Sequence, residues 1–222
     1  MEGNIRLTAA DGHRFSAYRA GPDTARRGLV VVQEIFGVNS HMRRVCDAFA
    51  TSGYAVVAPA LFDRAEPGVE LGYGPADIAR GRDLRAQVSD AAVLADIAAA
   101  AGALGTRPLG IIGYCWGGTV AWWGATRSKL FKAAVGWYGG GIAATRNEAP
   151  NCPVQLHFGE KDASIPLADI DLIRQAQPTA EIFVYPGAQH GFGCDDRASY
   201  SRPDAELAGQ RSLAFFAHHV RE

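Results

Sequence analysis

Six short apolar runs limit the fold of this 222-residue chain more than any other feature. They occupy residues 29–32, 54–58, 109–112, 133–138, 154–158 and 182–185 and show little polar alternation. Such runs are typical of strands buried on both faces of a mostly parallel sheet. The segments between them predict helices over residues 40–52, 88–104, 116–126, 166–175 and 205–220. Because strands and helices alternate, the sequence predicts a doubly wound α/β fold with helices on both faces of a central sheet.

The beginning of the chain has a different pattern. Residues 5–7 and 15–18 flank Asp11-Gly12, a dipeptide typical of hairpin turns, so we expect an antiparallel hairpin before the parallel sheet. Residues 63–75 are rich in glycine and proline and predict a surface excursion at a strand end, where ligand-binding loops gather. We expect residues 1–222 to form one domain, a usual size for an α/β fold.

Charge and composition exclude several classes of partner. The formal net charge of −1 provides no field that would recruit nucleic acid or an anionic membrane. Residues 1–6 lack the basic and apolar regions of a leader, and no stretch approaches the roughly 18 apolar residues of a membrane span. We therefore expect a cytoplasmic monomer that acts on a small molecule.

The four cysteines predict neither a metal site nor a disulfide framework. Cys46, Cys115, Cys152 and Cys194 are widely spaced, with no C-x-x-C pair and no histidine cluster beside them. Nothing in the sequence calls for a metal or another cofactor.

One of these cysteines is bracketed by glycines directly after an apolar run, in the sequence Gly113-Tyr114-Cys115-Trp116-Gly117-Gly118. This pattern is typical of a nucleophile elbow, a strained strand-to-helix turn that lifts the nucleophile above the sheet and needs small neighbours. The alternative interpretation is a buried structural cysteine, since free cysteines are among the most buried residues. Taken alone, the pattern favours neither interpretation.

A nucleophile in this kind of fold is followed along the chain by an acid and then by a base. Asp162 comes directly after the run 154–158, in a loop at the end of a strand, and is the best candidate for the acid. The other carboxylates considered are Glu160, Asp169 and Asp171. His190 lies in the loop after the next run and is the expected base, whereas the alternatives are His13, His41 and His157. Three suitable residue types in the expected order favour a catalytic Cys115.

A carboxylate also interrupts the end of the first parallel strand. Burial of an unpaired carboxylate is unfavourable, so Glu34 is expected to have a partner or a function, unless it only marks where the strand meets solvent. At this strand end a backbone N–H forms half of an oxyanion hole, and the residue after the nucleophile supplies the other half. These would be the amides of Ile35 and Trp116.

Four segments together resemble the dienelactone hydrolase family, a branch of the α/β-hydrolases. They are residues 33–39, 113–118, 159–162 and 190–192, and the similarity extends over essentially the whole chain. The resemblance implies a triad of Cys115, Asp162 and His190. It also implies that Glu34 interacts with the resting thiol and helps to form the thiolate when substrate displaces it.

Substrate contacts follow from the same resemblance. Well-known members hold a substrate carboxylate with two arginines, one located four residues after the triad histidine, and here that position is Cys194. The nearby Arg197, together with Arg80 or Arg82, would replace them, and Phe36, Trp137 and Tyr138 would wall the pocket. Trp137 and Tyr138 have an equally good interpretation as aromatic core.

The expected reaction is hydrolysis of a lactone or activated ester through a thioester. Because a thiolate leaves more readily than an amine or an unactivated alkoxide, acylation of a cysteine needs a substrate with a good leaving group. One alternative is a broad carboxylesterase or thioesterase that does not select carboxylated lactones. Another is a binding protein or redox sensor in which Cys115 is an oxidisable thiol.

Overall fold

One sheet holds all eight strands of the computed structural model, which describes residues 3–221. The strand order is β1-β2-β4-β3-β5-β6-β7-β8. The strands are β1 (Gly3–Thr8), β2 (Arg14–Ala20), β3 (Arg27–Val32), β4 (Tyr54–Pro59), β5 (Leu109–Tyr114), β6 (Ala133–Trp137), β7 (Val154–Gly159) and β8 (Glu181–Tyr185). Met1 and Glu2 lie outside the described residues. They belong to residues 1–6, the segment whose sequence does not have the pattern of a leader.

The predicted α/β fold is confirmed. β3 to β8 pair in parallel, and the N-terminal hairpin is antiparallel, with Ile5 opposite Ala17. The central strands β3, β4, β5, β6 and β7 are buried along nearly their whole length. Their non-alternating apolar sequences thus match a sheet that is covered on both faces.

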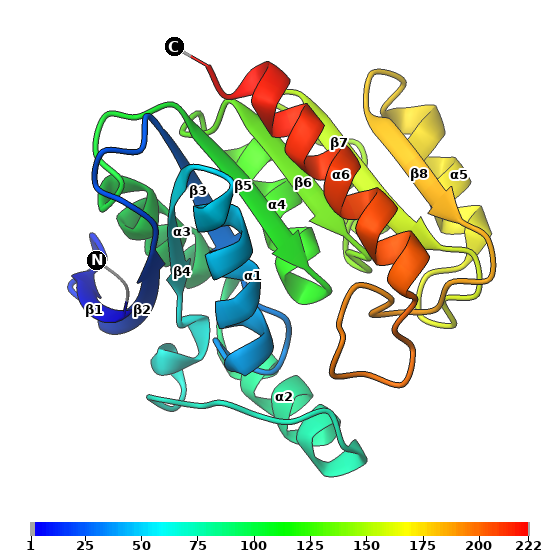
Figure 1. The fold of residues 1–222 in the computed structure, drawn as a ribbon. Helices are drawn as coiled ribbons and strands as arrows, with labels where there is room; N and C mark the ends of the chain where they lie inside the picture. The colour runs from blue at the N-terminus through cyan, green and yellow to red at the C-terminus, as the bar shows by residue number, and fades with distance from the viewer. Residues whose placement is uncertain (1–2, 222) are drawn as a thin grey trace.

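Helices cover the two faces of the sheet (Figure 1). They are α1 (Ser40–Thr51), α2 (Pro75–Gln87), α3 (Asp90–Gly102), α4 (Trp116–Arg127), α5 (Leu167–Ala176) and α6 (Arg202–His219). α1 and α6 lie on one face, where Phe49 and Phe216 meet edge to face, and α3, α4 and α5 lie on the other. Within residues 3–221, no helix has both the length and the apolar character needed to cross a membrane.

Most of the predicted excursion after β4 is confirmed, because residues 65–74 are irregular and none of them is buried; the structure corrects only its two ends. Residues Leu61–Arg64 form a buried 3₁₀ turn, in which the Asp63 carboxylate accepts hydrogen bonds from the amides of Ser16 and Gly68. The chain then forms α2, a helix that was not predicted. α2 lies at the carboxyl ends of the parallel strands (Figure 1), and its Gly81 packs so closely that an ideal Cβ would lie 2.1 Å from the Ile35 carbonyl oxygen. This close contact places one face of α2 over the loop that follows β3.

The register of the sheet brings the predicted site residues to one edge. Tyr114 at the end of β5 pairs with Trp137 at the end of β6, and Gly159 at the end of β7 pairs with Tyr185 at the end of β8. The residues that follow these strands therefore emerge side by side at the carboxyl edge, where open α/β sheets bind their ligands.

Candidate active site

Cys115 occupies a strained backbone turn between β5 and α4. Its φ of 55° and ψ of −118° lie outside the usual regions for a residue with a side chain. The turn fits only because its neighbours are glycines. An ideal Cβ at Gly113 would lie 1.9 Å from the Gly117 carbonyl oxygen, and one at Gly117 would lie 2.3 Å from the Val32 carbonyl oxygen. This backbone geometry is that of a nucleophile elbow.

The loops after β7 and β8 bring Asp162 and His190 together. The His190 Nδ1 atom lies 2.7 Å from Asp162 Oδ2, and the other carboxylate oxygen accepts a hydrogen bond of 2.8 Å from the Ser164 amide. The Asp162 side chain is fully buried, and the amide of Lys161 donates to the Ala188 carbonyl, which ties the two loops together. Asp162 thus orients the imidazole and leaves Nε2 for another partner.

The charge state of His190 depends on Cys115. Burial opposes the imidazolium, but when Cys115 carries a negative charge, that charge and the hydrogen bonds to Asp162 and Cys115 outweigh burial and raise the pKa of His190 to about 10. An imidazolium beside a thiolate is the pairing that activates a cysteine nucleophile.

This dependence makes a measurable prediction. Replacement of Cys115 by alanine removes the thiolate, so the pKa of His190 should fall from about 10, with Asp162 alone left to oppose the effect of burial. The pH titration of the His190 ring signals by NMR measures it, with Cys152→Ala as the control. A His190 that titrates at the same pH in both variants would contradict the pairing.

The other acids and bases considered from the sequence lie elsewhere. Glu160 accepts a hydrogen bond from the Gly187 amide, and Asp171 pairs with Arg174 on α5. His157 lies in the core, where its ring contacts the hydroxyl of Tyr185, and burial lowers its pKa to about 3. A histidine held neutral in this way has a structural role.

Glu34 is fully buried just after β3. Its Oε1 atom accepts a hydrogen bond of 3.5 Å from Arg197, while Oε2 has no hydrogen-bond partner among residues 3–221. Burial raises the pKa of Glu34, and the positive charges of Arg197, His41 and His190 only partly oppose this effect. The carboxyl group therefore holds a proton more readily than a solvated glutamate, and its carboxylate is a stronger base.

A pocket of about 410 Å³ opens above the elbow. Cys115 and His190 line it together with the two residues whose amides were predicted to form the oxyanion hole, Ile35 and Trp116. Trp116 is the first residue of α4, so its N–H lacks an intrahelical acceptor. The remaining lining residues are Phe36, Ile78, Arg82, Arg85, Thr119, Trp123, Gly140, Gly141, Ser164 and Arg197.

The dienelactone hydrolase family matches residues 15–220. The chain belongs to this family. A relative from Synechocystis sp., provisionally named a carboxymethylenebutenolidase, is 40% identical over 208 residues that cover 85% of this chain and 84% of the relative. A provisionally named carboxymethylenebutenolidase of Salmonella typhimurium is 36% identical over 241 residues, covering 99% of this chain and 88% of the relative.

A solved structure agrees with these relatives. A crystal structure provisionally described as a dienelactone hydrolase of Klebsiella pneumoniae is 37% identical, with a TM-score of 0.82, and the match covers 97% of this chain and 99% of the other. The predicted resemblance to the dienelactone hydrolase family is confirmed. The chain is a carboxylic ester hydrolase of that family.

The structure places only some of the candidate substrate-binding residues in the pocket. Arg82 and Arg197 line the pocket, whereas Arg80 lies outside it and pairs with Glu66. The Trp137 indole donates to Ser212 in the core, as its alternative interpretation required. Tyr138 is also fully buried, with a φ of 39°, and its ring meets the His190 ring edge to face. Cys194 lies behind the pocket, near Glu34 and His41.

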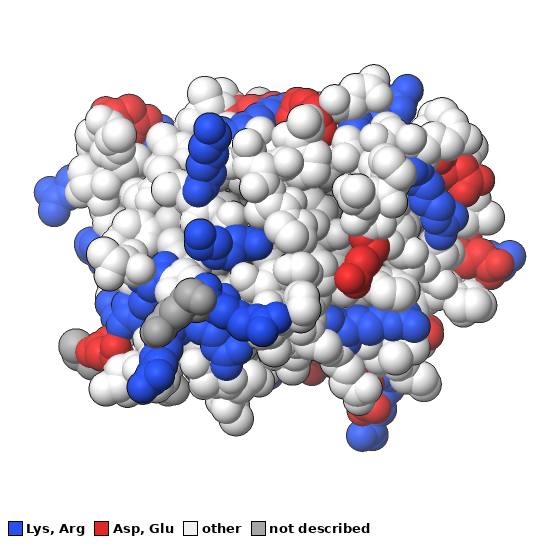
Figure 2. Space-filling model, turned by 90° about the horizontal axis from the view of Figure 1, so that it is seen from above, with Lys and Arg blue, Asp and Glu red and all other residues white. Residues whose placement is uncertain are grey.

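Sequence reasoning missed the contribution of α2. Ile78 and Arg85 line the pocket from this helix, and the Arg85 guanidinium lies 5.1 Å from the Trp116 ring centroid. Pro75 at the start of the helix, directly after Gly74, was the available signal, because proline is common in the first turn of helices. Basic side chains also gather on the face shown in Figure 2, but that face lies at the amino ends of the parallel strands, away from the pocket.

Proposed function

We propose that this enzyme hydrolyses a lactone or activated ester through Cys115 as nucleophile, with His190 as base and Asp162 as its orienting acid. The proposal rests on one observation. Cys115, in a strained turn bracketed by glycines, lines the same pocket as His190, whose imidazole is hydrogen-bonded to Asp162. A redox sensor needs no carboxylate behind the histidine, so this arrangement favours the enzyme over the sensor.

The reaction runs in two halves. The Cys115 thiolate attacks the carbonyl carbon, and the tetrahedral adduct collapses to a thioester as the leaving oxygen takes a proton from His190. Water then attacks the thioester carbonyl and gives a proton to His190, and the thiolate leaves with the electrons of the broken bond. The amides of Ile35 and Trp116 hold the oxyanion in both halves.

Glu34 fits a role in forming the thiolate. A carboxylate whose pKa is raised by burial is a better proton acceptor than a solvated one. In the structure its hydrogen-bond partner is Arg197, which also lines the pocket, so a substrate that engages Arg197 changes the surroundings of Glu34. This link would couple substrate binding to activation of the thiol.

The pocket favours a substrate with a carboxylate. Arg82, Arg85 and Arg197 all line it, and Arg82 has no salt-bridge partner within residues 3–221. Guanidinium groups bind carboxylates through charge-assisted, often bidentate hydrogen bonds. The second candidate function, a broad small-ester carboxylesterase or thioesterase, is favoured by Cys194 at the position where well-known family members have an arginine.

Turnover of a carboxylated dienelactone and of a neutral aryl ester tests both functions. We expect Arg82→Ala to lower kcat/KM for the carboxylated lactone by about 10- to 100-fold, the usual range for loss of a hydrogen bond to a charged group, and to leave the aryl ester unchanged. Arg80→Ala is the matched control, because this neighbour on α2 pairs with Glu66 outside the pocket. Equal losses for both substrates, or none, would favour the broad esterase. A monomeric state, a single domain and a cytoplasmic location remain predictions.

A further inference from the structure

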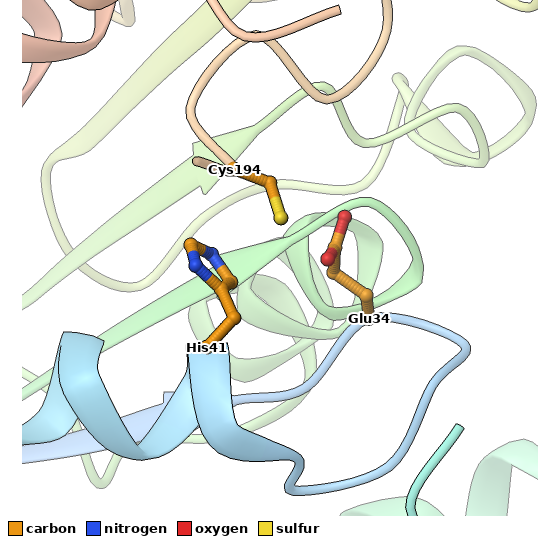
Figure 3. Close-up of side chains that lie close together, drawn as sticks. All are labelled: Glu34, His41 and Cys194. Atoms are coloured by element: carbon orange, nitrogen blue, oxygen red, sulfur yellow. The ribbon is translucent and has the colours of Figure 1, made fainter. Parts of the chain in front are cut away.

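Three buried side chains of different chemistry meet behind the active site. Glu34 comes from the loop after β3, His41 from the first turn of α1, and Cys194 from the loop that follows His190. Figure 3 shows the three side chains lying close together, and one ligand atom of each lies within 4.8 Å of the other two. All three residues are buried, with exposed fractions of 0%, 4% and 0%.

Two of the three side chains each have one polar atom without a hydrogen-bond partner among the described residues. Glu34 Oε2 and His41 Nε2 are buried, and neither has a hydrogen-bond partner within residues 3–221. Burial of an unpaired polar atom is unfavourable by roughly 1–3 kcal/mol, so native structures seldom leave two of them in one place. The Cys194 thiol, by contrast, has a hydrogen-bond partner in the Tyr73 side chain, which a metal ion would displace.

From this cluster we propose that Glu34, His41 and Cys194 form a binding site for one divalent cation of the zinc class. A thiolate, an imidazole and a carboxylate are the ligands that Zn²⁺ takes in tetrahedral sites, with water as the fourth. Zinc binds these atoms at about 2.0–2.3 Å, so its ligands lie about 3.3–3.8 Å apart and the three side chains need to move inward by only about 1 Å. Binding forms a metal–sulfur bond and releases the thiol proton to solvent.

The surroundings of His41 also suit a metal ligand. Its Nδ1 atom lies 2.9 Å from the Asp195 carboxylate, which Arg44 holds in turn. Metal-binding histidines usually donate their other ring N–H to a carboxylate, which fixes the tautomer and leaves the second nitrogen for the metal. Asp195 and Asp196 are exposed, and each has a carboxylate oxygen within 4.8 Å of a His41 ring nitrogen.

Arg197 is the one cationic side chain within hydrogen-bond distance of the Glu34 carboxylate among the described residues. It binds Oε1 at 3.5 Å and leaves Oε2 for the cation. A dication with one thiolate and one carboxylate forms a neutral cluster. The chain spacing hides this site from sequence reasoning, because Cys194 lies more than 150 residues from the other two ligands.

Cobalt(II) titration of the Cys115→Ser protein tests the site, since this background removes the Cys115 thiol, which lies beside His190 in the active site. We expect a sulfur-to-cobalt charge-transfer band that saturates at one ion per chain and disappears when Zn²⁺ is added. Cys194→Ser in the same background should abolish the band, and Cys152→Ser, which changes a remote half-buried thiol, should preserve it. A band that survives without Cys194, or no band in the Cys115→Ser protein, would overturn the proposal.

A second variant keeps the test decisive if Cys194→Ser does not fold. His41→Gln in the Cys115→Ser background retains the thiolate, so the band should remain while the affinity for Co²⁺ falls by about tenfold or more. Unchanged affinity would exclude His41 as a ligand and with it the proposed site. A carboxylate that ligates a cation cannot also accept the Cys115 proton, so a bound metal would exclude the role proposed above for Glu34. Both readouts are measured without ester turnover, so they test the site separately from the proposed reaction.

Discussion

Replacement of Cys115 by alanine should lower kcat for activated esters by about 10⁴-fold or more, the scale on which loss of a catalytic nucleophile acts. Without the sulfur no acyl-enzyme forms, and only binding and the amides of Ile35 and Trp116 still assist water. Removal of His190 in the same chain should add little, because residues that act as one unit show non-additive losses. Steady-state kinetics of the two single variants and the double variant measure both effects.

Cys152→Ala is the matched control for this experiment. Cys152 is also a partly buried free thiol, but it lines a separate surface hollow with Pro153 and His219. Its loss should leave turnover unchanged. If Cys115→Ala kept the wild-type rate, the thiol would have no part in the chemistry, and a binding or sensing role for the fold would be favoured.

The second large effect concerns the backbone of the elbow. An added methyl group at Gly117 would lie 2.3 Å from the Val32 carbonyl oxygen and 2.5 Å from that of Gln33. Both are main-chain atoms of the central sheet and its exit loop, so they have little freedom to move away. We expect Gly117→Ala to destabilise the fold by about 3 kcal/mol or more, at the upper end of the range for overpacking.

Gly209→Ala supplies the comparison within the same chain. Gly209 lies in α6, and an ideal Cβ there meets no atom within 4 Å. The substitution should therefore stabilise the protein by about 0.5–1 kcal/mol, since alanine is the better helix former. The free energy of unfolding in urea measures both variants. Equal stabilities for Gly117→Ala and Gly209→Ala would mean that the elbow is not as tightly packed as described.

The sheet was predictable because its signal is local. Each strand from β3 to β8 carries its own short apolar run, and the runs of β3 to β7, which are buried on both faces, can be recognised without knowledge of their neighbours. The juxtaposition of the site residues followed from a general rule, since the carboxyl ends of parallel strands share one edge. Cys115, Asp162 and His190 could therefore be placed near one another before any coordinates were known.

Apart from Pro75 at its start, the sequence of α2 gives little helix signal, because the stability of this helix depends on tertiary packing. Its sequence places Ile78 and Leu84 among charged residues without a clear apolar face, and the helix is located by the close contact of Gly81 with Ile35. The same limit applies to its arginines. Successive residues on a helix point about 100° apart, so Arg80 and Arg82 face different directions, and only the packing of Gly81 decides that Arg82 faces the pocket.

Contacts between residues far apart in the sequence set a third limit on what the sequence can predict, as the aromatic residues and the metal-binding candidates show. Trp137 belongs to the core because Ser212 on α6 accepts a hydrogen bond from its indole, a contact between residues far apart in the sequence. Glu34, His41 and Cys194 meet for the same reason. A search for closely spaced ligands along the chain misses any site that the fold assembles from distant loops.

The most direct test of the account is to locate the acyl group during turnover. Wild-type enzyme is mixed with an aryl ester of a hindered acid, whose acyl group water releases slowly, then quenched in acid and analysed by peptide mass spectrometry. The account predicts one acyl group per chain, carried on the peptide that contains Cys115 as a thioester that hydroxylamine removes. Turnover with the acyl group on another residue, or with no acyl-enzyme from the first turnover onward, would contradict it.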